Sequence, residues 1–559
     1  MTKLPKFVLL LLLIALTTAL CFGGGGGQKQ TPAQSGGRPT LTLGVQQASL
    51  ITDYKNNYYT QYLENLNNVN IDFYMLPTAT TEVITKVSLM VASNDLPDIL
   101  MCEGIRAEAR MDYGSNGAFL DLKKYLDDPA KAPNWAKITK ADKDQMLESM
   151  VSADGGIYGL ARYEPTPWNF SCLRYWMNKT WLDKLGLKMP TTTDEFRNAL
   201  IAFRDRDPNG NGLKDEIPLW GYYNGNYGEN PILAIINSFI FFNSNFMIAN
   251  SGDELTLDET GTKIIAPFTD PAFRQALQYL NTLFKDQTLN PAIFTNDQTQ
   301  YRAVLNNNPQ LVGCTTAGSV GNWTNADNNP NYLEYELMRP LKGPAGVQYT
   351  PYVYYVPMIT TYITSAAKNF DVAFKFVDLL YDVHTSTISY FGEEGVDWSS
   401  KPADLAGQIN GFLSAGAIDK LTLVTLTDTW TAPHAKTWRN IANRYYPMDL
   451  MISNARGELP GAGNAPSEVV RGVHYQIYDS MHPKNILPPL KYSADDAFRL
   501  AQPITDIRGY IKQSIAEFTT GVRDINNDAA WNGYLRELDN MGLANLMRTA
   551  QATWDRQRR

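Results

Sequence analysis

Histidine is scarce in this chain, with only four residues among 559. None of the four belongs to an HExxH pair, and the sequence contains neither a GxSxG elbow nor a GxxxxGK phosphate loop. The absence of these motifs argues against zinc proteases, serine hydrolases of the elbow type and nucleotide hydrolases. A glycosidase needs only two carboxylates, so the 57 acidic residues leave that class open, although no motif favours it.

Cysteine is equally sparse: the chain has Cys21, Cys102, Cys172 and Cys314. Four scattered cysteines make neither a disulfide framework nor zinc-ligand spacing. We expect the three after Cys21 to be small buried thiols, with a single bridge as the alternative.

The chain has one long apolar run, at residues 8–16, and none after it. This run is too short to cross a bilayer comfortably. Cys21 follows this run, and a Gly-rich polar stretch to about residue 37 reads as a flexible tether. The arrangement resembles a bacterial lipoprotein signal, in which the cysteine is lipidated and becomes the mature N-terminus. Leu20 departs from the small residue usual there, so plain secretion or an uncleaved anchor stays open. We assign residues 1–20 to the signal and 21–38 to the tether.

The net charge of −8 argues against nucleic acid or an anionic membrane surface as a partner. The chain instead has 31 tyrosines and 11 tryptophans. Their rings offer flat apolar faces with a polar edge, which suit an exposed binding cleft as well as a core.

Oxygen-bearing side chains alternate with glycines in residues 205–216, DRDPNGNGLKDE. Calcium takes six to eight oxygen ligands, and glycines permit the tight turns that bring successive oxygens inward. An EF-hand register would start at Asp205 and end at Glu216. A shorter register, which we prefer because Pro208 and the glycines bracket a compact ring, uses Asp207, Asn209, Asn211, the carbonyl of Leu213, Asp215 and Glu216. The alternative is a surface turn without an ion.

Strand and helix patterns alternate from residue 40 to residue 126, which predicts βαβ units around a largely parallel sheet. Expected strands cover residues 41–45, 69–73 and 99–101, with a helix over 81–92. Residues 156–163 read as a strand that crosses to a second lobe, and residues 340–344 as a second crossing before a strand over 352–359. Thr192 and Glu195 predict a capping box at the start of a helix.

Several segments match one family in order along the chain: ASNDLPD (92–98), WLDKLGL (181–187), PTTTDEF (190–196), DPNGNGLKDEIP (207–218), GEEG (392–395), FTTG (518–521) and WNGY (531–534). Together they resemble the LipO/alginate-binding branch of the bacterial extracellular solute-binding proteins, family 1. The resemblance covers nearly the whole mature chain.

The resemblance implies an α/β fold of the periplasmic-binding-protein kind, with two discontinuous lobes joined by hinge crossings around a cleft. We divide the chain into an N-lobe (39–162 plus 343–395) and a C-lobe (163–342 plus 396–559). The resemblance also implies that the loop at 207–216 binds a structural calcium ion away from the solute. The ion would be held by the residues of the shorter register.

The implied function is an exported, lipid-anchored and monomeric substrate-binding protein of an ABC importer, without catalytic activity. It would deliver a solute, most simply an oligosaccharide, to permease subunits with a separate ATPase. An oligopeptide-binding or sensory protein is the alternative, and a secreted glycan-active enzyme is less well supported.

Ligands of open α/β sheets lie beyond the carboxyl ends of the strands, here facing the interlobe cleft. Trp323 follows an expected strand over 311–315, and Glu103 follows the strand over 99–101. Trp168, Trp398 and Tyr352 lie near expected crossings. The rings could stack on sugar faces and the carboxylate could bind hydroxyls, with core packing or the lobe surface as the alternative for each. We therefore predict ligand contacts from Trp323, Trp398, Trp168, Tyr352 and Glu103.

Overall fold

The structure is a computed structural model that describes residues 37–225, 227–243, 254–319, 322–324, 330–399, 423–425, 433–439, 441–448, 450, 454–456, 477–478 and 480–558. The chain divides into a unit Met1–Pro39 and a compact unit Thr40–Arg559. Cys21, the predicted signal and most of the predicted tether lie outside the described residues.

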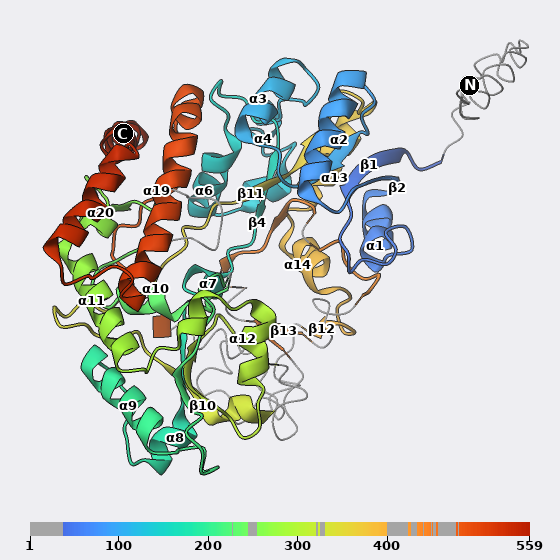
Figure 1. Cartoon of the computed structure of the whole chain (residues 1–559). Helices are drawn as coiled ribbons and strands as arrows, with labels where there is room; N and C mark the ends of the chain where they lie inside the picture. The colour runs from blue at the N-terminus through green and yellow to red at the C-terminus, as the bar shows by residue number, and fades with distance from the viewer. Residues whose placement is uncertain are drawn as a thin grey trace, which may run out of the picture. The chain divides into compact units, whose positions relative to one another are not determined.

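The N-lobe is built on a six-stranded sheet of order β14-β4-β11-β3-β1-β2 (Figure 1). Strand β1 pairs in parallel with β2 and β3, β14 pairs in parallel with β4, and β11 runs antiparallel between β3 and β4. The strands are β1 (Thr40–Gln46), β2 (Asn70–Leu76), β3 (Ile99–Met101), β4 (Leu160–Tyr163), β11 (Met358–Ile363) and β14 (Arg444–Tyr445). The expected βαβ units with a largely parallel sheet are thus confirmed for the first part of the chain.

Most helices of this lobe bury apolar side chains against its core, although α3 (Ala107–Ser115) has no fully buried residue. Helix α2 (Thr80–Ser93) buries Val83, Val87 and Met90, which recur at helical spacing. The other helices are α1 (Tyr58–Asn67), α3 (Ala107–Ser115), α4 (Lys123–Leu126), α5 (Pro133–Lys137), α6 (Lys140–Met150), α13 (Phe370–Leu379) and α14 (Val383–Phe391).

The C-lobe has a four-stranded sheet of order β10-β5-β9-β6, with β5 antiparallel to both neighbours. Its strands are β5 (Tyr175–Asn178), β6 (Ile217–Leu219), β9 (Val312–Thr316) and β10 (Tyr335–Met338). Helix α9 (Thr193–Asp205) begins with the predicted capping box between Thr192 and Glu195. A separate core of its own packs these elements against the C-terminal helices α19 (Ala494–Thr520), α20 (Asp528–Asn540) and α21 (Leu543–Gln557).

Smaller elements complete the C-lobe and one edge of the N-lobe. The C-lobe adds the helices α7 (Pro167–Phe170), α8 (Lys179–Lys184), α10 (Pro231–Ile236), α11 (Pro271–Lys285) and α12 (Gln298–Leu305), and the hairpin β7 (Thr256–Leu257) and β8 (Ile264–Ile265). A three-stranded sheet joins β12 (Trp398–Ser399), β13 (Leu423–Thr425) and β15 (Asn454–Arg456).

The second crossing lies further along the chain than the sequence pattern suggests. Residues 343–347 form a turn beside the start of α9, and the passage between lobes is the irregular segment 351–357. The strand expected over 352–359 therefore begins only at Met358, because Pro351 and Pro357 lack an N–H and the backbone between them bonds to the C-lobe through Phe170 and Asn243.

The predicted lobe boundary at residue 395 is also placed too early, because described residues after it pack in the N-lobe. Trp398, Trp438 and Tyr446 pack in the core of the N-lobe, and β14 extends its sheet, whereas the prediction assigned 396–559 to the C-lobe. Tyr478 and the helices from α19 onward pack in the C-lobe. The chain therefore returns to the N-lobe before it finishes in the C-lobe.

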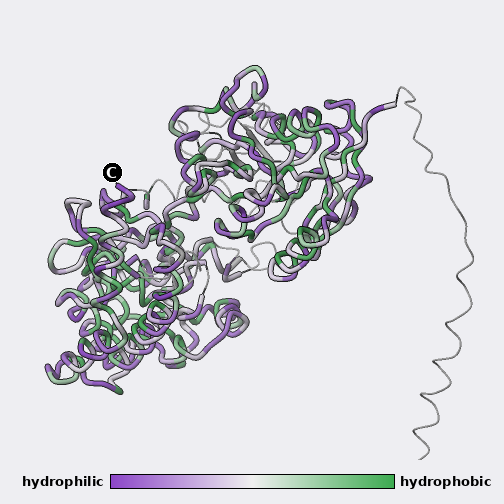
Figure 2. Tube along the Cα trace, turned by 90° about the horizontal axis from the view of Figure 1, so that it is seen from above, coloured by the Kyte–Doolittle hydropathy of each residue, from purple (hydrophilic) through white to green (hydrophobic). Residues whose placement is uncertain are grey.

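Apolar and polar stretches alternate closely along the trace (Figure 2). Among the described residues, no helix is both long and apolar enough to span a bilayer. Cys102, Cys172 and Cys314 are free and buried, as expected for small core thiols.

Candidate functional site

Charged side chains gather where N-lobe strands end and the chain crosses to the C-lobe. Glu103 follows β3, and Arg162 and Glu164 lie at the end of β4. Arg444 is in the neighbouring strand β14, and Met358 begins β11. Because parallel strands bring their carboxyl ends to one edge of a sheet, residues far apart in the chain meet here.

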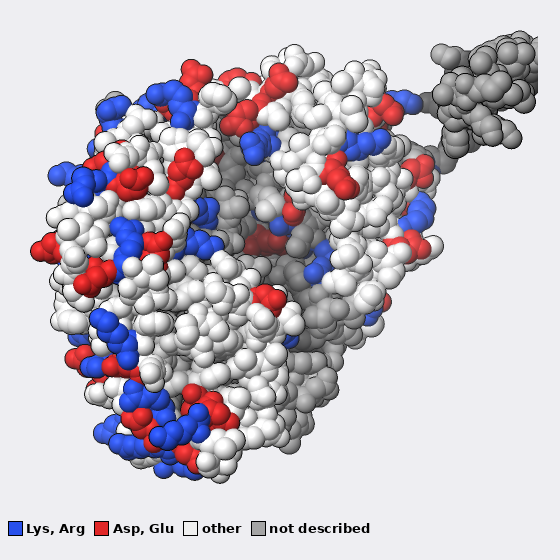
Figure 3. Space-filling model, in the orientation of Figure 1, with Lys and Arg blue, Asp and Glu red and all other residues white. Residues whose placement is uncertain are grey.

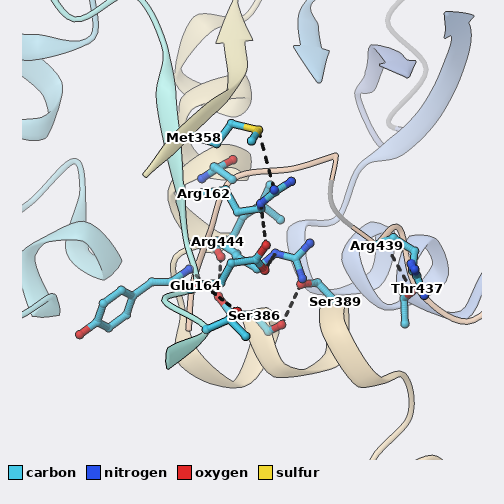
Figure 4. Close-up of polar contacts among 12 residues, drawn as sticks. Arg162, Glu164, Met358, Ser386, Ser389, Thr437, Arg439 and Arg444 are labelled. Atoms are coloured by element: carbon cyan, nitrogen blue, oxygen red, sulfur yellow. Dashed lines mark hydrogen bonds and ion pairs between the residues drawn. The ribbon is translucent and has the colours of Figure 1, made fainter. Parts of the chain in front are cut away.

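Arg162 is held between two carboxylates, of which Figure 4 shows Glu164. Its Nη1 lies 2.7 Å from Oε1 of Glu103, and its Nε lies 2.7 Å from Oε1 of Glu164. Its Nη2 also contacts the sulfur of Met358 at 3.8 Å. Burial opposes its charge, but Glu164 and Glu103 together raise the pKa of Arg162 above its usual value. The guanidinium is therefore fixed in place and permanently charged.

Arg444 lies close to Glu164, on the other side from Arg162 (Figure 4). Its side chain is 1% exposed, and its Nε is 3.4 Å from Oε2 of Glu164. The Tyr390 ring faces its guanidinium at 5.4 Å. None of its three guanidinium nitrogens forms a hydrogen bond of good geometry in the structure. Burial lowers the pKa of Arg444, and Arg162 acts in the same direction, while Glu164 opposes both. Glu164 is thus the carboxylate that connects the two arginines.

Tyrosines of the second crossing cover this charged cluster. The hydroxyl of Tyr355 accepts a hydrogen bond from the backbone N–H of Glu164 at 2.7 Å. Tyr352 packs its ring 5.7 Å from Phe170 and 4.1 Å from His482. Burial, and next the charge of Glu164, raise the pKa of Tyr355, so its hydroxyl stays neutral.

Two adjoining cavities lie along the crossing segment. The first, of about 280 Å³, is lined from the N-lobe side by Arg162, Glu164 and Met358 and from the C-lobe side by Asn169, Asn243 and Leu487. The second, of about 900 Å³, lies between α3 and α6 on one side and α19 and α21 on the other. Both share residues 354–356 and 489–490 as lining. The space-filling view shows a hollow that contains both acidic and basic side chains (Figure 3).

Two polar contacts connect α6 to the other side of the second cavity. Gln145 donates to the backbone carbonyl of Tyr355 at 3.1 Å. Lys491 donates to the carbonyl of Glu148 at 3.0 Å and lies 3.6 Å from its carboxylate. These contacts join the N-lobe to the crossing and to the segment before α19.

Two of the predicted ligand contacts come together at this site. Tyr352 lines the first cavity, and Glu103, whose side chain is 29% exposed, binds the arginine that lines it. Their contact with a ligand stays a prediction, and Glu103 itself is not among the described residues that line either cavity.

The predicted tryptophans are placed differently. Trp323 is completely buried and packs edge-on against Trp176 and Tyr335 in the C-lobe core. Trp398 is 3% exposed, and its indole donates to the carbonyl of Gly392. Neither ring presents a free face for stacking in this structure, so we leave both out of the proposed site. Trp168 lies in α7, and its side chain is outside the described part of the structure.

The loop at 207–216 folds around its own oxygen-bearing side chains. The Asp207 carboxylate accepts from the backbone N–H groups of Gly210 at 2.9 Å and Gly212 at 3.0 Å. Asn209 and Asn211 both donate to the carboxylate of Asp215, at 3.1 and 2.9 Å. Asp207, Gly210 and Gly212 have positive φ angles, which allow this tight winding.

Two further observations concern the carboxylates of this loop. Oε1 of Glu216 is buried without a hydrogen-bond partner, and burial, followed by the charges of Asp207 and Asp215, raises the Glu216 pKa. Asp205 instead pairs with its neighbour Arg204 at 2.7 Å. Counting only His, Cys, Asp and Glu, the described residues contain no group of three that could hold a metal. Any ion here would thus depend on the asparagine and backbone oxygens as well.

Arg162, Glu164, Tyr355 and Arg444 were not predicted from the sequence. Arg162 and Glu164 could have been found, because they end a predicted strand at the predicted first crossing. Arg444 could not, because β14 is only two residues long and shows no sequence periodicity.

Comparison with known proteins gives a consistent result. The chain is 26% identical over 508 residues to the fructooligosaccharide ABC transporter substrate-binding protein FusA of Streptococcus pneumoniae, covering 89% of this chain and 86% of FusA. It is 25% identical to the polygalacturonan/rhamnogalacturonan-binding protein YtcQ of Bacillus subtilis, over about half of each chain, and 23% identical to Lipoprotein LipO of Bacillus subtilis, over 56% of this chain and 59% of LipO.

Among solved structures, FusA in complex with kestose matches with a TM-score of 0.66 at 23% identity, and an extracellular solute-binding protein of Bifidobacterium longum subsp. infantis with 0.70 at 19%. Each alignment covers 93% of this chain and 99% of the other. The α/β fold is therefore that of the periplasmic solute-binding proteins, as predicted. The family model for bacterial extracellular solute-binding proteins matches residues 48–383. The chain belongs to the bacterial extracellular solute-binding protein family.

Proposed function

We propose that this protein is the substrate-binding component of an ABC importer and that it holds an oligosaccharide between its lobes. The observation that carries the proposal is the first cavity, where a fixed guanidinium–carboxylate pair lies beside tyrosine rings and asparagine amides. Sugar hydroxyls both donate and accept hydrogen bonds, and sugar C–H faces pack on aromatic rings. The relatives with a stated ligand, FusA and YtcQ, are both glycan-binding proteins.

We propose no catalytic step. Glu103 and Glu164 are both paired with Arg162, an arrangement suited to holding hydroxyl groups in place. Transport energy would come from separate permease and ATPase subunits. An oligopeptide would be the alternative cargo, since the same cavity offers amide partners and paired charges.

The proposal extends to the location of the protein. A lipid on Cys21 and the tether that follows would hold the folded unit at the outer surface of the cell membrane. Mass spectrometry of the protein purified from its native membrane tests this, because a diacylated N-terminal cysteine has a characteristic mass. An N-terminus other than Cys21, or an unmodified Cys21, would refute the lipid anchor.

We also propose that the loop at 207–216 binds calcium as a structural ion. The loop fits such an ion because Glu216 has a buried, unpartnered oxygen, and asparagine and backbone oxygens of the same loop could complete the ligand set. The shorter register is favoured, since Asp205 is already paired with Arg204. Asp207, Asn209, Asn211, Leu213, Asp215 and Glu216 would hold the ion. One of the similar solved structures is that of a FusA EF-hand mutant, which supports an ion-binding loop in this relative.

The direct test is a binding screen. Purified protein would be titrated with oligosaccharides and with peptides, and binding followed by thermal shift and calorimetry. We expect saturable stabilisation by at least one oligosaccharide and recovery of that sugar chemically unchanged. Stabilisation by peptides alone, or cleavage of a bound glycan, would refute the proposed function.

A further inference from the structure

From the pairing of charges around the two cavities, we infer that the ligand is a neutral oligosaccharide rather than a chain of uronic acids. The inference rests on the proposed function and narrows it to one chemical class. The named relatives differ on this point: fructooligosaccharides are neutral, whereas polygalacturonan carries a carboxylate on each residue. The structure of this chain favours the neutral class.

Among the described lining residues of the first cavity, Arg162 is the one cation, and two carboxylates bind it directly. Glu103 and Glu164 both lie 2.7 Å from its guanidinium. Of these two carboxylates only Glu164 belongs to the described lining; the other lining carboxylate, Glu254, pairs with Arg508 at 3.1 Å. Its other polar side chains are neutral hydroxyls and amides, including Thr166, Asn169 and Tyr352.

Arg444 is the cation that could otherwise receive an acidic ligand, since its nitrogens lack good hydrogen bonds. It is 1% exposed and is not part of the lining of either cavity. Arg444 contacts Oε2 of Glu164, whereas Arg162, which lines the first cavity, contacts Oε1 of the same carboxylate. Glu164 therefore lies between Arg444 and Arg162. Arg444 therefore acts as a positioning residue for Glu164 and does not offer a contact to a ligand carboxylate.

The second cavity is also balanced in charge. Its described lining includes three carboxylates and three cations, namely Glu108, Glu148, Asp496, Arg110, Lys491 and Arg556. Of these, Glu148 and Lys491 contact each other, and Arg110 donates to the backbone carbonyls of Ile105 and Ser149. A ligand that extends from the first cavity into the second thus meets no surplus of positive charge.

Acidic and neutral sugars would interact differently with the charges around Arg162. A uronate carboxylate entering beside Arg162 would approach Glu103 and Glu164, and like charges at short range repel. A neutral sugar can donate hydroxyls to these carboxylates and accept from the guanidinium without adding charge. Arg162 with its two carboxylates therefore favours neutral sugars and disfavours uronates.

The test compares two pools of matched length at low salt, one of neutral fructo-, xylo-, malto- and galacto-oligosaccharides and one of oligogalacturonates and oligoalginates. Native mass spectrometry of the full protein identifies what is retained, and calorimetry measures each Kd. We expect a neutral sugar to bind at least tenfold more tightly than any uronate. A uronate that binds as tightly or more tightly overturns the inference while the proposed function stands. Retention of neither pool overturns both.

A charge variant tests the cause of the preference. Glu103→Gln keeps the shape of the side chain and leaves Arg162 with one carboxylate partner instead of two. We expect the ratio of uronate to neutral affinity to rise at least tenfold. Glu537→Gln, on α20 and outside the lining of both cavities, controls for the change in net charge. An unchanged ratio in Glu103→Gln, with a native melting curve, would overturn the role assigned to the charge pairing.

Discussion

At the scale of single residues, the charged cluster under the crossing tyrosines is the most demanding part of this molecule. Arg444 carries a full charge at a position that water barely reaches, and Glu164 is the carboxylate nearest to it. Removing one partner of a buried ion pair leaves an uncompensated charge, which costs far more than breaking an exposed pair. The cluster therefore contributes to folding as well as to the proposed site.

Replacing Glu164 by glutamine should lower the free energy of unfolding by about 3 kcal/mol, because Arg444 then lacks its carboxylate partner. Urea denaturation followed by circular dichroism measures the change. Glu148→Gln, which breaks the more exposed pair with Lys491, should cost less than about 1 kcal/mol. Equal losses in the two variants would mean that the buried pair has no special role in stability.

Tyr352 lines the first cavity, and we predict that its ring packs on a sugar ring. Tyr352→Ala should weaken binding of the identified ligand by about 1–3 kcal/mol, a five- to 150-fold rise in Kd. Tyr352→Phe keeps the ring and should stay within a few-fold of the wild type. Calorimetry on both variants decides the point, and a wild-type Kd in Tyr352→Ala would remove this ring from the site.

Glu103 was picked out because it follows a strand with a clear pattern, and its contact with a ligand stays a prediction. Tyr352 was picked out as the start of a strand that in fact begins at Met358, so it lines the first cavity for a different reason from the one predicted. Sequence reasoning overvalued Trp323, since a tryptophan after a strand looks alike whether its ring faces a cleft or, as here, packs against Trp176 and Tyr335. It missed Arg444, because a strand of two residues has no periodicity to detect. Burial is a property of the assembled cores, and one chain segment cannot reveal it.

At the scale of elements, the loop after α9 joins that helix to β6 through a ring of carboxylates and amides. Without an ion, Asp207, Asp215 and Glu216 place like charges close together, and burial adds to the cost of ionising Glu216. An ion that binds only the folded state would stabilise it by mass action. The loop is thus expected to depend on calcium more than its neighbours do.

Removal of calcium by a chelator should lower the melting temperature, and added calcium should restore it. Asn209→Ala should lower calcium affinity at least tenfold, whereas Asp205→Ala, outside the shorter register, should leave it nearly unchanged. Elemental analysis and calorimetry provide the measurements. If the loss of Asp205 weakens calcium binding as much as the loss of Asn209, the EF-hand register is correct. No change in melting after verified metal removal would show a turn without an ion.

Helices and strands with strong local signals were predictable, while the positions of the crossings were less so. The capping box of α9 was found from Thr192 and Glu195 alone, because its chemistry is local. The second crossing was placed too early, at 340–344, since Pro340, Gly343 and Pro344 resemble a linker. In the structure Lys342 exchanges backbone hydrogen bonds with Thr191 and Thr193 at the start of α9, and Gly343 bonds to Gly346 and Val347. Only the segment 351–357 leaves the lobe.

At the scale of the whole molecule, two cores share one chain that passes between them more than once. The N-lobe sheet takes strands from three separate parts of the sequence, 40–163, 358–363 and 444–445. The helices that follow, α19 to α21, pack in the C-lobe. Such discontinuous lobes with cavities along a crossing suit a protein that encloses a ligand and releases it unaltered. On our inference, the pairing of charges around those cavities favours a neutral ligand over an acidic one.

The most direct test of this account is calorimetry of the full protein with neutral and uronic-acid oligosaccharides of equal length, followed by mass spectrometry of the recovered sugar. The account predicts saturable binding of a neutral oligosaccharide, at least tenfold tighter than any uronate, and recovery of that sugar intact. Tight binding of uronates, binding of peptides alone, or recovery of a cleaved sugar would contradict it.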